Sequence, residues 1–172
     1  MRYFFTILLC ILTLSTSGLA SVSFDGVWAL DLKASDSPEQ MLKRMGVSFM
    51  ERKLAASTKL ESTYHRSGNL LTVTTRAAGF SRTETFPLDG RTEKKHEKQT
   101  GPYTIRTAWS KDGKELVSTV NFKTRNRKKA ELIVTRRLTN REDTLVLRQT
   151  LTIEGEPDTP AVDRIWQRKT RG

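Results

Sequence analysis

Residues 37–58, SPEQMLKRMGVSFMERKLAAST, decide the fold, because they hold the only two convincing helical signals in the chain. The pattern predicts a short helix over residues 37–45, with Ser37 as its N-cap, a proline at the first helical position and Gly46 as its stop. It predicts a second helix over residues 48–58, with an apolar side and a charged, solvated side. The rest of the chain after the second helix is predicted to form strands.

Short runs of alternating polar and apolar residues, separated by turn residues, fill the rest of the chain. The candidate strands are residues 24–32, 60–66, 69–77, 80–87, 91–99, 102–110, 114–123, 130–138, 143–153 and 161–169. The expected hairpin turns are Ser67-Gly68-Asn69, Asp89-Gly90, Thr100-Gly101-Pro102 and Lys111-Asp112-Gly113, with residues 123–129 as a longer, exposed hairpin.

About ten strands at hairpin spacing form an up-and-down meander, and such a meander usually closes to remove its edges. The sequence therefore predicts an all-β fold: a closed antiparallel up-and-down barrel, with the two helices capping one open end. Only 36% of the chain is hydrophobic, which is low for a solid core. Many inward positions must then be polar or basic, and a barrel of this strand count is wide enough to enclose a ligand cavity with water.

Residues 1–20, MRYFFTILLCILTLSTSGLA, have the charged start, apolar run and small-residue exit of a secretory signal peptide. We expect cleavage after Ala20, no lipid anchor at Cys10, and a secreted protein, periplasmic or extracellular. Residues 21–172 are then a single domain without cysteine, so its own core must hold the fold. We expect it to be a monomer.

The formal net charge is +11 and falls by one when Arg2 leaves with the leader. This balance favours anionic partners such as acidic lipid surfaces, fatty carboxylates or acidic polymers. Nucleic acid is not expected, because few aromatic residues accompany the basic runs. His65 and His96 lack neighbours at metal-ligand spacing, and no nucleophile-elbow pattern is present, so the sequence predicts no metal, no cofactor and no enzyme.

The last candidate strand lies within residues 160–170, PAVDRIWQRKT. Because strand side chains alternate, Val162, Arg164, Trp166 and Arg168 share one face. A guanidinium beside a large aromatic ring fits either plain solvent or a cavity that holds an anion with an apolar body.

Four segments together resemble the fatty-acid-binding and retinoid-binding proteins, a lipid-binding branch of the calycin superfamily. They are FDGVWALDL (24–32, with Gly26-x-Trp28), MLKRMGVSFMERKLA (41–55), GFSRTETFPLDG (79–90) and the run from WSKDGKELV to DRIWQR (109–168). The resemblance covers residues 24–168 and implies an exported carrier that binds a fatty acid or a similar lipophilic anion inside the barrel.

The resemblance also implies site residues. The family holds a fatty carboxylate through two arginines and a tyrosine, which correspond here to Arg136, Arg164 and, in place of the tyrosine, Trp166. An indole N–H donates but does not accept, so Trp166 changes the head-group site. A guanidinium can bind a carboxylate through two parallel hydrogen bonds, which agrees with the two arginines.

We further expect Leu145 and Leu147 to line the path of the ligand tail. By resemblance, Leu42, Val47 and Phe80 border the portal beneath the helical lid. Basic lid residues favour docking on an anionic membrane: Lys43, Arg44, Arg52 and Lys53.

Two alternatives stay open. Either Arg136 or Arg164 could be structural, stacked across Trp28 by a cation–π contact, whereas Arg137 and Arg168 are expected to be solvated. The barrel could also be packed shut, as in calycin-type inhibitor modules that bind a protein or an acidic polymer. A carrier needs its arginines to face an unfilled lumen, whereas an inhibitor module fills that lumen with large apolar side chains.

Overall fold

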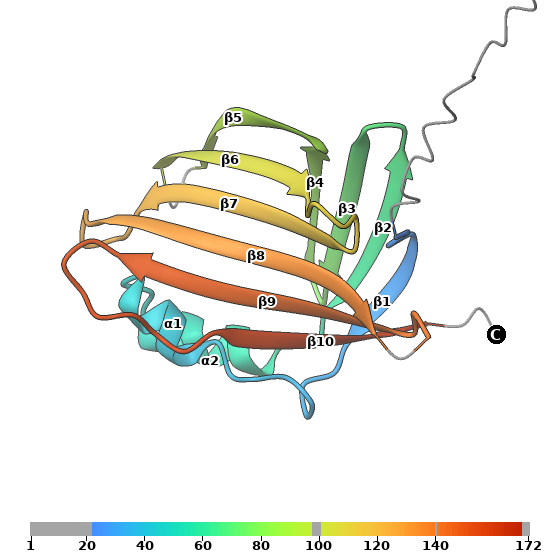
Figure 1. The fold of residues 1–172 in the computed structure, drawn as a ribbon. Coiled ribbons are helices and arrows are strands. Elements are labelled where there is room, and N and C mark those ends of the chain that lie inside the picture. The colour runs from blue at the N-terminus through green and yellow to red at the C-terminus, as the bar shows by residue number, and fades with distance from the viewer. Residues whose placement is uncertain (1–21, 98–100, 140, 170–172) are drawn as a thin grey trace, which may run out of the picture.

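The computed structural model describes residues 22–97, 101–139 and 141–169. The predicted signal peptide and the turn residue Thr100 lie outside these ranges. Ten strands and two helices follow one another (Figure 1): β1 (Gly26–Leu30), α1 (Glu39–Arg44), α2 (Phe49–Ser57), β2 (Glu61–Ser67), β3 (Leu70–Ala77), β4 (Phe80–Pro87), β5 (Asp89–Glu97), β6 (Gly101–Trp109), β7 (Glu115–Lys123), β8 (Lys129–Thr139), β9 (Thr144–Ile153) and β10 (Val162–Arg168).

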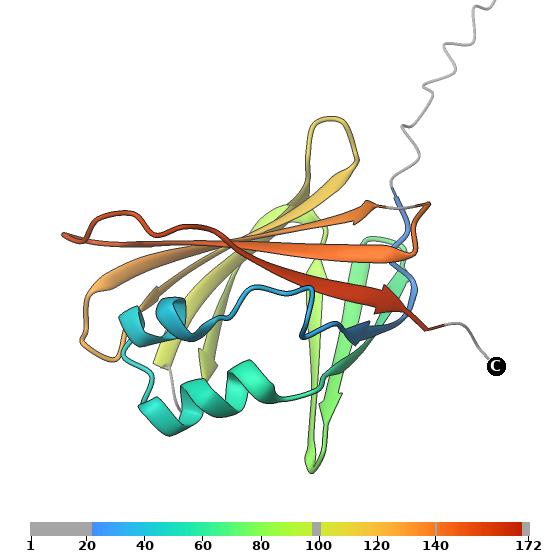
Figure 2. The same cartoon turned by 90° about the horizontal axis from the view of Figure 1, so that it is seen from below.

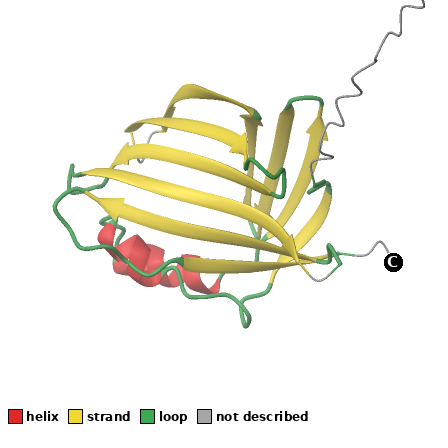
Figure 3. Ribbon diagram, in the orientation of Figure 1, coloured by secondary structure: helices red, strands yellow, loops and turns green. Residues whose placement is uncertain are grey.

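The ten strands form one sheet in the order β4-β3-β2-β1-β10-β9-β8-β7-β6-β5. The pairs in this order are antiparallel, and β1 pairs with β10, so the sheet wraps round on itself (Figure 3). The predicted up-and-down barrel with two helices is confirmed, and it is nearly closed. The two end strands, β4 and β5, form no backbone ladder with each other among the described residues.

The hairpin expected at Asp89-Gly90 is wrong, because these residues begin β5 rather than turn the chain back onto β4. The register of β5 against β6 shifts between Asp89 and Thr92, and Gly90 adopts a φ of +76° there. The carbonyl of Gly90 accepts a hydrogen bond from Arg106 Nε at 2.7 Å. This bulge sends β5 toward β6 and leaves an opening beside β4.

The two helices cover one end of the barrel, which Figure 2 shows from below. Ser48 and Glu51 form a capping box at the start of α2, which satisfies the first backbone N–H groups of the helix. The N-cap predicted at Ser37 is wrong: Pro38 occupies that position and makes no side-chain cap. Within the described residues, no helix is long and apolar enough to cross a membrane.

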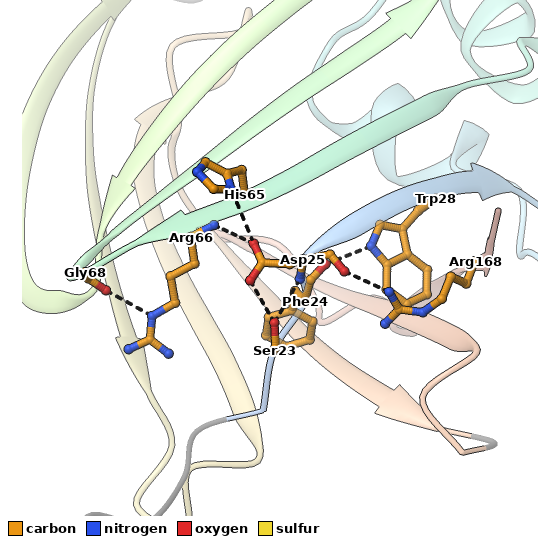
Figure 4. A network of polar contacts seen from close by, with 8 residues as sticks. All are labelled: Ser23, Phe24, Asp25, Trp28, His65, Arg66, Gly68 and Arg168. Carbon is orange, nitrogen blue, oxygen red and sulfur yellow. Dashed lines mark hydrogen bonds and ion pairs between the residues drawn. The ribbon is translucent and has the colours of Figure 1, made fainter. Parts of the chain in front are cut away.

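The opposite end of the barrel is plugged by the N-terminal segment, whose polar contacts with β2 and β10 are drawn in Figure 4. Phe24 is 2% exposed and stacks on Trp109, with their ring centroids 5.7 Å apart. Trp28 is fully buried and donates its indole N–H to the carbonyl of Phe24 at 2.9 Å. Asp25 accepts the backbone N–H of Arg66 at 2.6 Å and so joins this segment to the end of β2.

Arg168 is the cation that stacks on Trp28, with its Cζ 4.2 Å from the ring centroid. The expectation that Arg168 is solvated is therefore wrong, because β10 pairs with β1 in a register that sets Arg168 opposite Trp28. Its guanidinium also donates to the carbonyls of Asp25 at 2.7 Å and Glu142 at 3.0 Å. Arg136 and Arg164 are thus left free of this structural role.

Replacing Arg168 with alanine should lower the free energy of unfolding by about 1–2 kcal/mol, because one cation–π contact and two hydrogen bonds are lost. Arg137→Ala is the matched control, since Arg137 is exposed on the neighbouring sheet surface and its loss should cost less than about 0.5 kcal/mol. Urea unfolding followed by tryptophan fluorescence measures both. Equal effects of the two variants would contradict the structural role of Arg168.

Candidate functional site

A cavity of about 240 Å³ lies inside the barrel on the side of the lid, where the lid is defined as α1, α2 and the turn between them. Strands β4 to β8 and the end of α1 supply its walls. The lining residues are Met45, Arg82, Glu84, Phe86, Glu97, Tyr103, Ile105, Ser118, Val120, Phe122, Leu132, Val134 and Arg136. Apolar side chains therefore alternate with a few charged and hydroxyl groups, which is the usual make-up of a ligand site.

Arg136 is the buried cation of this cavity and is only 8% exposed. Its Nη1 donates to the Ser118 hydroxyl at 2.9 Å, and that hydroxyl shares a hydrogen bond of 2.9 Å with Thr107. The guanidinium lies 5.4 Å from the Phe86 ring centroid, and within the part of the chain that the structure describes its Nε has no hydrogen-bond partner. A buried guanidinium held only by neutral partners retains donors for an anion.

Arg164 is the second buried arginine, also 8% exposed. The register places Arg136, Leu147 and Arg164 in one row across β8, β9 and β10, so the two arginine backbones are about 10 Å apart. Burial lowers the pKa of Arg164, and no described residue forms an ion pair or hydrogen bond with its guanidinium. Two positive charges without acidic partners on one interior row make the electrostatic potential inside the barrel more positive. They therefore favour the binding of an anion there.

Trp166 and Leu145 belong to the packed half of the barrel. They face each other across β10 and β9, and they are 6% and 0% exposed. The Trp166 indole N–H is buried and has no hydrogen-bond partner among the described residues. Together with Trp28 and Leu116 they fill the plugged end, whereas the lid end holds the cavity.

Of the eight site residues predicted from the sequence, Arg136 alone lines the cavity. Leu147 lies beside it on β9, partly buried against the core, and Arg164 follows on β10. In the lid, Leu42 and Val47 are half-buried, and Phe80 is 54% exposed at the start of β4. Met45, not Leu42 or Val47, is the lid residue that reaches the cavity wall. The ligand-binding and portal roles of these residues stay predictions.

A charged group in the cavity wall was missed by the sequence analysis. Arg82 Nη2 lies 2.9 Å from Glu84 Oε1, and Arg82 also pairs with Glu97 across the opening between β4 and β5. Burial alone would lower the Arg82 pKa, but the two carboxylates raise it. Burial, then Glu84 and Glu97, raise the pKa of Tyr103 beside them. The alternation in FSRTETF could have revealed this group, because it puts Arg82, Glu84 and Phe86 on one face.

The lid is tied to the β7–β8 loop through Arg125. Its guanidinium donates to both oxygens of Glu51 at 2.7 and 2.8 Å, and its backbone N–H donates to Met45 O at 3.0 Å. The hydrogen bond from Arg125, followed by that from Ser48, lowers the pKa of Glu51 to about 2. The loop approaches so closely that a Cβ on Gly46 would lie 2.8 Å from the Cβ of Arg125.

A second tie holds α1 to the loop between β9 and β10. Arg44 Nε donates to Glu156 at 3.1 Å, and Arg44 Nη2 donates to the carbonyl of Pro157 at 2.6 Å. Lys128 bonds the other Glu156 oxygen at 2.7 Å. Lys128 and then Arg44 lower the Glu156 pKa. Binding of Arg44 to a membrane surface would therefore compete with its contacts to Glu156 and Pro157.

Glu51→Gln should loosen the lid, because the amide cannot form the bidentate ion pair with Arg125. Amide hydrogen exchange of residues 49–57 at neutral pH should become faster than in the wild type. The folded-state pKa is depressed, so the ion pair contributes fully above the ordinary pKa of 4.5 and is lost as the pH falls toward about 2. The difference between the two proteins should therefore shrink over that window.

Glu154→Gln is the matched control, since Glu154 is exposed and lies 3.8 Å from Lys129, a pair that includes no lid residue. It should leave exchange in α2 unchanged. Unchanged exchange in Glu51→Gln would show that Arg125 does not hold the lid.

A larger hollow of about 660 Å³ lies over β5 to β9. Its lining includes one cross-strand row formed by Lys94, Thr104, Asn121, Glu131 and Thr152. These positions alternate with the buried ones, so they face away from the barrel interior. The hollow contains neither Arg136 nor Arg164, but it adjoins the interior cavity, because Tyr103 and Phe122 line both.

Comparison with known proteins supports the fold. No family model matches the sequence, and no curated protein matches it. A mutant of the REP1-NXSQ fatty acid transporter matches with a TM-score of 0.66 and 14% identity over 84% of this chain and 97% of that one. Caenorhabditis elegans lipid binding protein 8 matches with a TM-score of 0.65 and 18% identity over 85% and 95% of the two chains.

Human cRBP IV also matches, with a TM-score of 0.65 and 19% identity over 86% of this chain and 99% of that one. This chain therefore has the fold of the fatty-acid-binding and retinoid-binding proteins, as its sequence motifs predicted.

Proposed function

We propose that this protein is an exported, monomeric carrier that binds a fatty acid or a similar lipophilic anion inside its barrel, and that it is not an enzyme. The observation that carries the proposal is Arg136, a buried guanidinium on the wall of a largely apolar cavity with only neutral partners. The fold neighbours bear the names of a fatty acid transporter and a lipid binding protein, which agrees with this role.

The cavity favours an anion that carries an apolar body. Arg136 can donate to a carboxylate while Ser118 fixes the orientation of its guanidinium. Arg164 lies next to Leu147 in the same cross-strand row and adds a second positive charge, with no carboxylate partner among the described residues. The apolar wall of Val134, Val120 and Ile105 then removes the ligand tail from water.

Arg136→Gln should weaken binding of a fatty carboxylate by about 2–5 kcal/mol, because one partner of a buried charge-assisted pair is lost. Binding of the matching fatty alcohol should change little. Arg164→Gln should act in the same direction, and Arg137→Gln is the exposed control. Titrations followed by tryptophan fluorescence measure all three. Equal losses for acid and alcohol would show that these arginines are structural.

Native mass spectrometry of the purified protein separates the carrier from the inhibitor-like alternative. A carrier should retain a co-purified lipophilic anion, and mild delipidation should restore the mass of the bare chain. Failure to bind any lipophilic acid after delipidation would favour a module whose partner is a protein or an acidic polymer.

We further propose that the lid docks on an anionic membrane to exchange its ligand. Phe49, Met50 and Leu54 of α2 are 58%, 75% and 67% exposed, so this helix presents apolar side chains to solvent. Lys53 lies over the Phe49 ring, 5.6 Å from its centroid, and Lys43 is exposed on α1. Apolar groups that insert beside cations that attract lipid head groups are typical of interfacial helices.

The double variant Met50→Ser/Leu54→Ser should bind anionic vesicles more weakly than the wild type in co-sedimentation. Neither side chain is buried, so the barrel should stay folded. Leu70→Ser, at an exposed leucine in β3, is the control and should retain vesicle binding. Equal binding to anionic and zwitterionic vesicles, or unchanged binding by the double variant, would contradict docking through the lid.

A further inference from the structure

The turn between β7 and β8, together with the strand ends on either side of it, is strongly basic. Residues 123–129, KTRNRKK, contain five cations and no acidic side chain, and we call this segment the basic loop. Lys123 and Arg127 are exposed, and their side chains form no ion pair or hydrogen bond with a described residue. Positive charges that no acid of the protein offsets attract an anionic surface.

The basic loop is held in one shape by Thr124, which is 5% exposed. Its backbone N–H donates to the carbonyl of Lys128 at 2.9 Å, and its hydroxyl accepts the Lys128 N–H at 3.2 Å. Its carbonyl accepts the N–H of Arg127 at 2.8 Å, and Arg127 adopts a φ of +65°. Glycine would occupy this left-handed position with less strain. Strained residues cluster at ligand contacts, so the conformation of Arg127 indicates a role for its charge.

The basic loop lies beside the lid, and Figure 2 shows the turn between β7 and β8 next to the two helices. Arg125 bonds Glu51, the third residue of α2. The two residues before Glu51 are Phe49 and Met50, which are 58% and 75% exposed. Cations next to exposed apolar side chains match the interface of an anionic membrane, which offers phosphates above an apolar layer. A soluble acidic polymer would match the cations alone.

The ion pair between Arg125 and Glu51 can open at such a surface. The two side chains keep 40% and 45% of their surface accessible, so a phosphate oxygen can approach the guanidinium. Exposed ion pairs contribute little in water, and a phosphate accepts the same two parallel hydrogen bonds as a carboxylate. The pKa of Glu51 is lowered to about 2, so Glu51 stays charged near neutral pH. A competing anion, rather than a proton, must therefore displace it from Arg125.

We propose that the basic loop binds phosphate groups of anionic phospholipids and that Arg125 exchanges Glu51 for one of them, so that docking on a membrane releases the start of α2. This inference rests on the proposed docking of the lid and adds the basic loop as a second contact. Arg125 joins the two contacts, because in solution it holds the lid and at the membrane it holds a lipid. Ligand exchange is then favoured at the membrane over free solution.

Co-sedimentation with vesicles of phosphatidylglycerol and phosphatidylcholine tests the loop contact. Arg127→Gly should weaken vesicle binding about fivefold, as expected for the loss of one cation near acidic lipid. The variant should stay folded, because glycine relieves the positive φ at this exposed position.

Arg141→Gly is the matched control. Arg141 is also exposed and has a φ of +56°, but its turn lies at the plugged end, where the carbonyl of Glu142 accepts a hydrogen bond from Arg168. The control should change vesicle binding less than about twofold, because salt screens a charge that far from the docked surface. Equal losses in the two variants would overturn the inference.

Glu51→Gln tests the exchange of partners. The variant frees Arg125 in advance, so it should bind the same vesicles about threefold tighter than the wild type, in line with the strength of an exposed ion pair. Glu154→Gln removes the same charge beside the basic loop, 3.8 Å from Lys129, and leaves Arg125 paired. It should tighten binding less. An equal gain in both variants would show that net charge alone acts, and it would also overturn the inference.

The outcomes separate this inference from the docking of the lid. If Met50→Ser/Leu54→Ser weakens vesicle binding and Arg127→Gly does not, the inference fails and docking through the lid stands. If neither variant weakens binding, both fail. If Arg127→Gly instead loses affinity for soluble polyglutamate and keeps its affinity for vesicles, the partner of the basic loop is an acidic polymer and the inference is overturned.

Discussion

The pairing of β1 with β10 is the constraint on which the rest of the structure depends, because it turns a ten-stranded meander into a barrel with an interior. Three residues secure this seam. Trp28 fills the plugged end, Arg168 lies across its ring, and Gly26 leaves room, since a Cβ there would lie 2.6 Å from Arg168 Nη1. Gly26 also adopts a φ of +135°, which side chains rarely tolerate. The Gly-x-Trp pattern is therefore a requirement of closure.

The sheet closes where β1 pairs with β10 and stays open between β4 and β5. The interior is mainly apolar beside the first and carries charged side chains beside the second. Near Trp28 the lumen is filled by side chains such as Leu116 and Leu145, which are fully buried. Near the opening between β4 and β5, side-chain bridges replace the missing ladder, and they bring charges into the wall. The low hydrophobic content of the chain agrees with the charged and polar side chains that line the interior cavity.

The period-two alternation sufficed to predict the strands, their antiparallel order and the faces of β8 and β10, because burial on one side of a strand imposes that period. It could not show that β4 and β5 part, since Asp89-Gly90 has the chemistry of a turn whether or not its strands pair. Nor could it show which arginine stacks on Trp28. That depends on the register between β1 and β10, which is set by residues far apart in the sequence. The alternation of FSRTETF could have predicted that Arg82 and Glu84 share a strand face. It could not have predicted that Arg82 pairs with Glu97 across the opening between β4 and β5.

The lid differs physically from the barrel that it covers. No residue of α2 is buried, so hydrophobic packing contributes little to its position. Its capping box and the ion pair between Glu51 and Arg125 hold it instead, whereas α1 has both the ion pair of Arg44 with Glu156 and the buried side chain of Met41. Such exposed contacts are individually weak and are screened by salt. Displacing α2 alone would therefore break polar contacts without disturbing the core, whereas α1 is anchored in a hydrophobic cluster through Met41.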